Sequence, residues 1–328
     1  MGSLPTAPLL CAICGAAAAG VVYRDSVAPF DNIFTLVRCA RCGLIRTDPA
    51  PTEEALRDYY QAYAEHMAAA GRAVMSDAET LARAQTDVAD LERFHRPGRL
   101  LDIGCGGGHL LRAAAQRGWQ VFGTEMGEAV IAALRREFGC EHIQPADAGM
   151  RDLPGVPAEA ANGRRVGESC SGGAAVAAAN AVGPTWAGGT PAPPLPAAFR
   201  SFDAIVLRHV LEHLRDPGAM LRRARELLVP GGVLLCEVPD VNALRIRLRH
   251  RPLMGQLHLW HFGARSLRAF LGHCGFEVRG ICFRDHRGPA VTPGRRAARR
   301  LRLALENAAW RLGVDIGANL RVYAASAT

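Results

Sequence analysis

From residue 100 onward, apolar runs of strand length alternate with amphipathic segments of helix length. The apolar runs that predict strands are 100–103, 120–125, 142–147, 202–208, 232–238, 276–283 and 320–325. The segments with helical spacing are 110–114, 128–138, 217–228, 266–272 and 295–312. This alternation is typical of a parallel sheet with helices on both faces. The pattern therefore predicts an α/β fold with a doubly wound, mostly parallel sheet of seven strands.

The chain outside these elements differs in composition. Residues 1–48 carry two Cys-x-x-Cys pairs, while residues 49–97 contain few Gly or Pro and have apolar positions at helical spacing. We therefore expect an N-terminal cysteine module over 1–48, a helical linker or cap over 49–97, and an α/β domain over 98–328. Residues 149–199 are rich in Gly, Ala and Pro, which predicts a low-complexity insertion within that domain.

The first strand of the α/β domain runs into a glycine-rich turn. Residues 99–111 read RLLDIGCGGGHLL, so Gly104 and Gly106 lie between a strand and a helix. Such turns let the backbone approach a nucleotide closely. His109 stands where the dinucleotide fingerprint has its third glycine, and Glu125 ends the next strand, where a ribose hydroxyl would be held. These residues predict a nucleotide-type cofactor and leave both NAD and S-adenosylmethionine open.

The distribution of charge and the cysteine content indicate which partners and which cellular compartment to expect. The net charge is +8, every basic residue is arginine, and residues 245–302 contain fourteen Arg against Glu277 and Asp285. This basic segment suits phosphates or an anionic membrane surface, or is a solvated face. The ten cysteines do not have the spacing of a disulfide scaffold, and no signal peptide or apolar run of about 20 residues is evident. We therefore expect a cytoplasmic protein.

The N-terminal cysteines have the pattern of a metal site. Cys11 and Cys14 form one pair, Cys39 and Cys42 form the other, and 24 residues separate the pairs. Four thiolates on two knuckles complete the tetrahedral coordination that Zn²⁺ takes in structural sites. The alternatives are free thiols or a redox pair, although neither pair sits in a βα unit. The spacing predicts a zinc ribbon whose Zn²⁺ is structural, because four protein ligands leave no open position for catalysis.

Four segments together carry a family resemblance. LDIGCGGG, GTEM, FDAIVLRHVLEHLRDP and ELLVPGGVLLCEVPD follow one another in the order found in class I S-adenosylmethionine-dependent methyltransferases, which this sequence resembles over about residues 98–283. The resemblance implies a Rossmann-like fold and the cofactor S-adenosylmethionine. The residues that it assigns to the cofactor are Asp102, Gly104, Cys105, Gly106, Glu125, Met126, Asp147, Ala148 and His209.

The resemblance also implies what these residues do. Asp102 and the glycine turn would line the methionine and ribose part of the cofactor, and Glu125 would accept the ribose hydroxyls. A carboxylate that accepts hydroxyl protons makes strong, charge-assisted hydrogen bonds. Asp147 would hold the adenine amino group, unless it is a solvated loop acid, and His209 would border the site.

Residues 39–60 extend the resemblance. They read CARCGLIRTDPAPTEEALRDYY and resemble the opening module of methyltransferases in sugar and secondary-metabolite pathways. In the related sugar C-methyltransferases, a His-Glu-His-Leu…Phe segment carries the catalytic base. Residues 256–262 read QLHLWHF, so His258 matches the second histidine, while Gln256 and Leu257 depart from the pattern. We therefore expect His258 to be the general base, with His261 as second choice, three residues away and on the same face if the segment is helical.

A second resemblance concerns residues 209–213. The run His209-Val-Leu-Glu212-His213 is similar to the Glu-x-x-Glu-His run with which ubiquinone-pathway O-methyltransferases bind a metal, except that His209 replaces the first Glu. Imidazole and carboxylate groups both suit divalent metals. In the alternative interpretation, Glu212 and His213 brace the helix that follows the strand.

These observations favour a methyltransferase that acts on a small hydroxylated or sugar-type acceptor, such as a nucleotide sugar or secondary metabolite, by O- or C-methylation. One alternative is an rRNA or tRNA methyltransferase that binds RNA through the zinc ribbon and the basic segment. However, the Pro-Pro-Tyr run of base-modifying amino methylases is absent and aromatic residues are few. Another alternative is a non-enzymatic zinc-ribbon adaptor.

The helix over 295–312 either packs on the sheet edge or touches a membrane with Leu301, Leu305 and Leu312.

Overall fold

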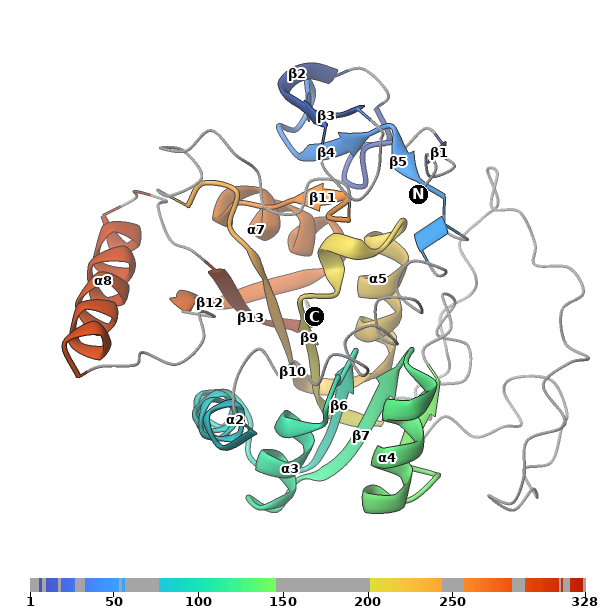
Figure 1. Cartoon of the computed structure of the whole chain (residues 1–328), viewed down its shortest axis with the longest axis vertical. Coiled ribbons are helices and arrows are strands. Elements are labelled where there is room, and N and C mark those ends of the chain that lie inside the picture. The colour runs from blue at the N-terminus through green and yellow to red at the C-terminus, as the bar shows by residue number, and fades with distance from the viewer. Residues whose placement is uncertain are drawn as a thin grey trace, which may run out of the picture.

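The structure is a computed structural model (Figure 1). It describes residues 6–7, 10–16, 19–26, 33–52, 55–56, 77–145, 201–243, 257–284, 293–312, 314 and 319–326. The predicted insertion over 149–199 lies outside the described residues, and so do Asp147 and Ala148.

A seven-stranded sheet forms the centre of the molecule, with the order β12-β13-β10-β9-β6-β7-β8. Its strands are β6 (Arg99–Ile103), β7 (Gln120–Glu125), β8 (Ile143–Pro145), β9 (Phe202–Arg208), β10 (Leu228–Pro239), β12 (Phe276–Arg284) and β13 (Asn319–Ser326). β13 pairs antiparallel with both of its neighbours, and the other pairs are parallel. The sequence prediction of a mostly parallel, seven-stranded sheet is confirmed.

Helices cover both faces of this sheet (Figure 1). They are α2 (Asp77–Leu91), α3 (His109–Ala115), α4 (Glu128–Phe138), α5 (Pro217–Leu227), α7 (Ala264–His273) and α8 (Pro293–Arg311), with a 3₁₀ turn, η3, over Leu211–His213. Leu100 packs in a core cluster with α2, α3 and α4, whereas its neighbour Leu101 packs in another with α5 and α7. Successive side chains of a strand point to opposite faces, so β6 is apolar on both sides. The fold is thus doubly wound.

The N-terminal segment folds as a small β-module. The strands β2 (Ala19–Ser26), β3 (Ile33–Cys39) and β4 (Ile45–Asp48) form a meander, and β1 (Thr6–Ala7) pairs with β5 (Ala50–Pro51). A strand from a distant part of the chain extends this meander: β11 (Trp260–His261) pairs with β4, which makes a four-stranded sheet. Trp260 lies opposite Arg46, and His261 opposite Ile45.

The β-module and the α/β domain also share one hydrophobic core. Cys11, Cys39 and Leu44 belong to the same buried cluster as Leu259 and Trp260. The pairing with β4 holds residues 260–261 in an extended conformation, not in the helical one considered from the sequence. The two histidines at 258 and 261 are therefore placed by sheet pairing and packing.

None of the described helices has the length and apolarity needed to cross a bilayer.

Candidate functional site

The turn after β6 begins the candidate cofactor site. Gly104 and Gly106 have positive φ angles of 70° and 51°, a conformation that favours glycine. A Cβ atom on Gly104 would lie 2.7 Å from the Cγ2 atom of Val210, so this glycine is also required by packing. A Cβ atom on Gly106 would meet nothing within 4 Å. The backbone at Gly106 therefore faces open space, which leaves room for a ligand to approach it.

Glu125, at the end of β7, is held against this turn. One oxygen of its carboxylate accepts the N–H of Gly106 at 2.8 Å, and the other accepts those of Met126 at 2.8 Å and Gly127 at 3.1 Å. These charge-assisted bonds fix the carboxylate. A carboxylate oxygen has more than one acceptor position, so the group can still accept hydroxyl protons. Met126 beside it has an exposed fraction of 47% and offers an apolar surface.

Asp102 lies beneath the turn with a side chain that is 1% exposed. Burial raises the pKa of its carboxyl group to about 6, although the positive charge of Arg208, whose Nη2 lies 3.8 Å from Oδ2, works in the opposite direction. Within the described residues, the buried Oδ2 atom has no hydrogen-bond partner. A cation placed at the turn would stabilise the ionised carboxylate, because opposite charges attract strongly where water is excluded.

The cofactor edge, defined here as Asp102, Gly104, Gly106, Glu125 and Met126, fits S-adenosylmethionine in chemistry. The fixed carboxylate of Glu125 suits the sugar hydroxyls of the cofactor, and the buried carboxylate of Asp102 suits its positive charge. The open backbone at Gly106 allows the cofactor to approach closely. Cys105 contributes its buried side chain to the core beneath the turn, and its N–H donates to the carbonyl of Thr124 at 2.9 Å.

His209 follows β9, the strand next to β6, and is the non-glycine residue with positive φ, 55°, in the described backbone. Its Nδ1 lies 3.3 Å from Glu212 Oε1, and its Nε2 lies 3.5 Å from Glu237 Oε1. Burial alone would lower its pKa, but the two carboxylates outweigh burial and raise the pKa to about 9. His209 is therefore an imidazolium at neutral pH and is a poor proton acceptor.

His258 and His261 lie together beside the N-terminal module. The Oγ1 of Thr47, on β4, donates to the carbonyl oxygen of His258 at 2.7 Å and lies 3.1 Å from His261 Nε2. Since the threonine has donated its one hydroxyl proton, His261 must donate from Nε2. Burial lowers the pKa of His261 to about 4, so the ring is neutral. The His261 side chain therefore forms part of the contact between β4 and β11.

The ring of His258 packs against η3. It packs edge-on against His213, with 4.7 Å between the ring centres, and His213 Nδ1 lies 3.0 Å from the carbonyl oxygen of Leu257. Ligand atoms of Glu212, His213 and His258 lie within 4.8 Å of one another, in a group that could hold a metal ion. The structure thus brings His258 to Glu212 and His213, while His209 bridges Glu212 and Glu237. We call residues 209, 212, 213, 258 and 261 the histidine edge.

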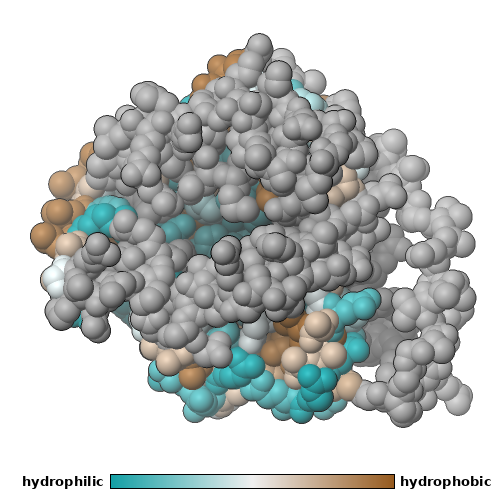
Figure 2. All heavy atoms as spheres, in the orientation of Figure 1, coloured by the Kyte–Doolittle hydropathy of each residue, from teal (hydrophilic) through white to brown (hydrophobic). Residues whose placement is uncertain are grey.

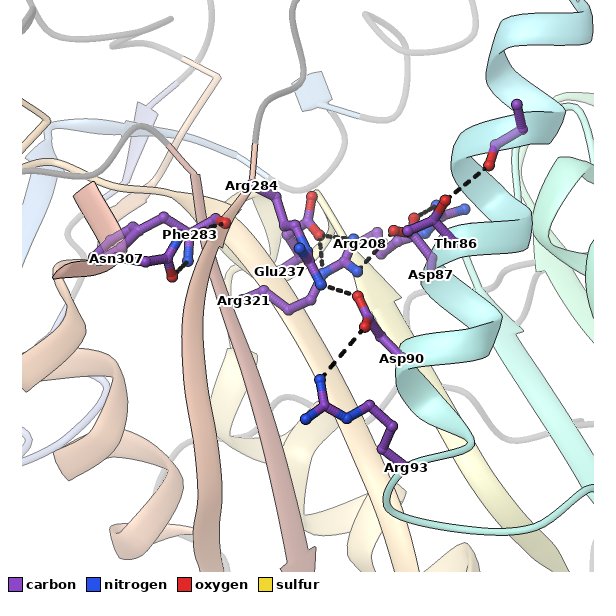
Figure 3. Close-up of polar contacts among 11 residues, drawn as sticks. Thr86, Asp87, Asp90, Arg93, Arg208, Glu237, Phe283, Arg284, Asn307 and Arg321 are labelled. Carbon is purple, nitrogen blue, oxygen red and sulfur yellow. Dashed lines mark hydrogen bonds and ion pairs between the residues drawn. The ribbon is translucent and has the colours of Figure 1, made fainter. Parts of the chain in front are cut away.

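An ion network that the sequence analysis did not identify includes Glu237, which also contacts His209. Figure 3 shows its arginines and carboxylates. Arg321 on β13, 1% exposed, donates to Asp87 Oδ1 at 2.7 Å and to Glu237 Oε2 at 2.5 Å. Arg208 donates to Asp87 Oδ2 at 3.1 Å and faces Asp102. The network joins α2 and the last strand to the cofactor edge. Its sequence signal is a charged residue within an apolar strand, seen at Glu237 and Arg321.

The four N-terminal cysteines converge as predicted. Their Sγ atoms all lie within 4.8 Å of one another, with 3.3 Å between Cys11 and Cys42 and 3.4 Å between Cys14 and Cys39. Sulfurs in a tetrahedral zinc site with Zn–S bonds of about 2.3 Å lie roughly 3.8 Å apart. Burial raises the pKa of Cys11 and Cys42, whereas at Cys39 the hydrogen bonds from backbone N–H groups and neighbouring thiols outweigh burial and lower the pKa to about 6. The cluster therefore fits Zn²⁺.

Both cysteine knuckles have the same backbone geometry. The N–H of Gly15 donates to the carbonyl of Cys11 at 2.8 Å, and that of Gly43 to the carbonyl of Cys39 at 2.9 Å. The two glycines have positive φ angles of 67° and 77°. Each pair of thiols is therefore presented by a tight turn that glycine allows.

Comparisons with known proteins agree with this geometry. Residues 74–280 match the model of the family described as Methyltransferase domain, which is more than half of the chain. The fold and the cofactor edge define the class I S-adenosylmethionine-dependent methyltransferases, and the chain belongs to this methyltransferase family.

Two sets of relatives and one solved structure are particularly informative. The chain is 33% identical over 144 residues to a "Ubiquinone biosynthesis O-methyltransferase" of Cereibacter sphaeroides, covering 44% of this chain and 42% of the relative. A protein of the same name from Pseudomonas aeruginosa is 28% identical over 145 residues, covering 44% and 45%. The chain thus spans less than half the length of these relatives. A crystal structure of 1,6-didemethyltoxoflavin-N1-methyltransferase from Burkholderia thailandensis has the same fold, with a TM-score of 0.50, 16% identity, and coverage of 94% of this chain and 99% of that one.

Proposed function

We propose that this protein transfers the methyl group of S-adenosylmethionine to a hydroxyl group of a small acceptor. The observation that carries the proposal is the position of the histidine edge. β6 and β9 are hydrogen-bonded neighbours in a parallel pair, so the residues that follow them lie at the same edge of the sheet. Ligands of open α/β sheets bind at that edge. The relatives' name, O-methyltransferase, supports oxygen as the acceptor atom.

The cofactor edge would hold the cofactor. We assign the ribose hydroxyls to Glu125, the positively charged amino-acid part to Asp102, and the close backbone approach to Gly104, Cys105 and Gly106. Met126 would offer its apolar surface to the purine, and Asp147 and Ala148 would complete that end. The cofactor, when bound, would supply an electrophilic methyl group: the acceptor oxygen would bond to the methyl carbon as its bond to the sulfonium sulfur breaks and S-adenosylhomocysteine leaves.

His258 is our candidate for the general base. A hydroxyl acceptor must lose its proton during the displacement, and a neutral imidazole suits that task near neutral pH. His209 already carries a proton, since its pKa is raised to about 9, and His261 donates to Thr47. Among these three residues, we therefore assign the proton acceptor to His258. Its placement between His213 and β11 would orient the ring.

The cysteine cluster would bind a structural Zn²⁺. All four coordination positions are filled by thiolates, so the metal has no site for a substrate. Its effect on catalysis would be indirect, because β4 pairs with β11 and Thr47 contacts both candidate histidines. The resemblance of the module to sugar and secondary-metabolite enzymes favours an acceptor of that size.

The test is methyl transfer from isotope-labelled S-adenosylmethionine into a cell extract, followed by separation of products by size. We expect label in the small-molecule fraction, and less of it when Glu125→Ala protein replaces the wild type. Label in RNA would overturn the proposal and favour the RNA methyltransferase alternative. A protein that binds the cofactor but labels neither fraction would also contradict it.

A further inference from the structure

Helix α8 has one face that the rest of the protein covers. The N–H of Phe283, on β12, donates to the side-chain oxygen of Asn307 at 3.0 Å, and the Phe283 ring packs edge-on against Trp310 with 6.2 Å between centres. Glu306, 7% exposed, pairs with Arg302 one turn earlier at 3.3 Å. These contacts hold the helix against the outer edge strand of the sheet and leave its opposite face exposed.

The opposite face of α8 is apolar. Leu301, Leu305 and Leu312 have exposed fractions of 63%, 60% and 83%, and Val314 beyond the helix has 49%. At about 100° per residue, the three leucines fall within an arc of about 40°. Exposed alanines at 297, 304 and 308 lie on the same side. Figure 2 shows hydrophobic residues exposed at the left edge of the molecule, where Figure 1 places α8. Such a stripe in contact with water indicates a binding surface.

The charge of the helix indicates what this face binds. α8 contains six Arg and one Glu, and exposed Arg300 and Arg311 lie beside the leucine stripe. An apolar face bordered by arginines is suited to lie in the interface of an anionic bilayer, where leucines enter the acyl region and guanidinium groups meet phosphates. We propose that the exposed face of α8, defined by Leu301, Leu305, Leu312, Arg300 and Arg311, binds the surface of an anionic membrane.

A second copy of the chain suits this face less well. Stable protein interfaces bury about 1,200–2,000 Å² in total, more than one narrow stripe of leucines and alanines offers. Pairing of two α8 helices would also bring their arginines together, and like charges repel. A bilayer needs neither a large area nor a complementary shape. The inference depends on α8 and does not depend on the acceptor proposed above.

The experiment is co-sedimentation of the full chain with vesicles of phosphatidylcholine, with and without phosphatidylglycerol. We expect binding to the anionic vesicles and little to the neutral ones. The double variant Leu301→Ser/Leu305→Ser should reduce the partition coefficient by about tenfold for each leucine. Arg300→Gln/Arg311→Gln should reduce it by about fivefold for each arginine, with a smaller effect at high salt.

Two control variants match these changes. Val21→Ser removes an apolar side chain of similar exposure, 59%, on the N-terminal module, and Arg136→Gln removes an exposed arginine of α4. Both should bind vesicles like the wild type, and unchanged thermal melting of all variants shows that they fold. Absence of wild-type binding to anionic vesicles would overturn the proposal. So would binding that survives the leucine changes, or a solution dimer that those changes dissociate.

Discussion

The cofactor edge and the histidine edge lie at the ends of the neighbouring parallel strands β6 and β9, yet they are built in different ways. The cofactor edge comes from one stretch of chain, in which Gly106 and Glu125 are 19 residues apart and hydrogen-bonded. The histidine edge joins distant segments, since Thr47 bonds to His258 across 211 residues. The first depends on a local strand-turn-helix pattern, and the second depends on the N-terminal module being folded and docked.

This difference has a consequence for function. A change in the N-terminal module should disturb acceptor chemistry and leave cofactor binding largely intact. A change in the turn after β6 should do the opposite. The two edges meet through Arg208, which faces Asp102 and precedes His209, so coupling between them is expected to pass through the ion network.

Removal of the Zn²⁺ that we propose for the cysteine cluster should have the largest effect. Structural zinc contributes about 10–16 kcal/mol in zinc-finger peptides, which is as large as the stability of a whole domain. Chelation, or Cys39→Ser, should therefore unfold the meander and release β11, abolishing methyl transfer. Affinity for S-adenosylmethionine, measured by calorimetry, should change by no more than a few fold. Cys282→Ser, at a free thiol on β12, is the control. Equal loss of cofactor affinity would show that the two edges are not separable.

Replacement of His258 should come next. His258→Gln removes the proton acceptor, and general-base catalysis typically contributes about 10²–10⁴-fold. We expect kcat to fall by that factor in a steady-state assay, with unchanged KM for the cofactor. His261→Gln, which breaks the bond to Thr47, should lower the melting temperature and reduce kcat by much less. A larger catalytic loss from His261→Gln would reverse the assignment of the base.

Loss of the Glu125 carboxylate should weaken the cofactor edge alone. Glu125→Ala removes the hydrogen bonds that its charged carboxylate would accept, so cofactor affinity should fall by roughly 1–3 kcal/mol, about 5–150-fold. Zinc content should not change. Glu128→Ala removes an exposed carboxylate three residues along the chain and should bind the cofactor like the wild type. If calorimetry gave the same affinity for both variants, the role assigned to Glu125 would be wrong.

The pH dependence of cofactor affinity should show the smallest effect. The pKa of Asp102 is raised to about 6 by burial, so its carboxyl gains a proton as pH falls through that value. The neutral form no longer attracts a cation. Affinity should therefore be full above about pH 7 and fall by about tenfold for each unit below pH 6. Asp102→Asn should bind more weakly without this pH dependence, and a wild-type affinity that is flat down to pH 5 would contradict the assignment.

The parts of the molecule that the sequence predicted well are those with local signals. The strands over 120–125 and 202–208 and the helix over 128–138 match the structure, because strand and helix periodicities are read within single segments. The cysteine knuckles were also predictable, since two short motifs define them. The parts that were missed need tertiary contacts. β11 exists because β4 pairs with it, and the bond between Asp87 and Arg321 spans 234 residues.

The central claim is that cofactor and acceptor chemistry occupy neighbouring strand ends under a zinc-stabilised module. A crystal structure of the full chain with S-adenosylhomocysteine and the acceptor found by labelling tests it most directly. We predict the ribose hydroxyls on Glu125, the amino-acid part at Asp102, zinc among the four thiolates, and the acceptor oxygen within hydrogen-bonding distance of His258. A ribose away from Glu125, or an acceptor oxygen that His258 cannot reach, would contradict the account.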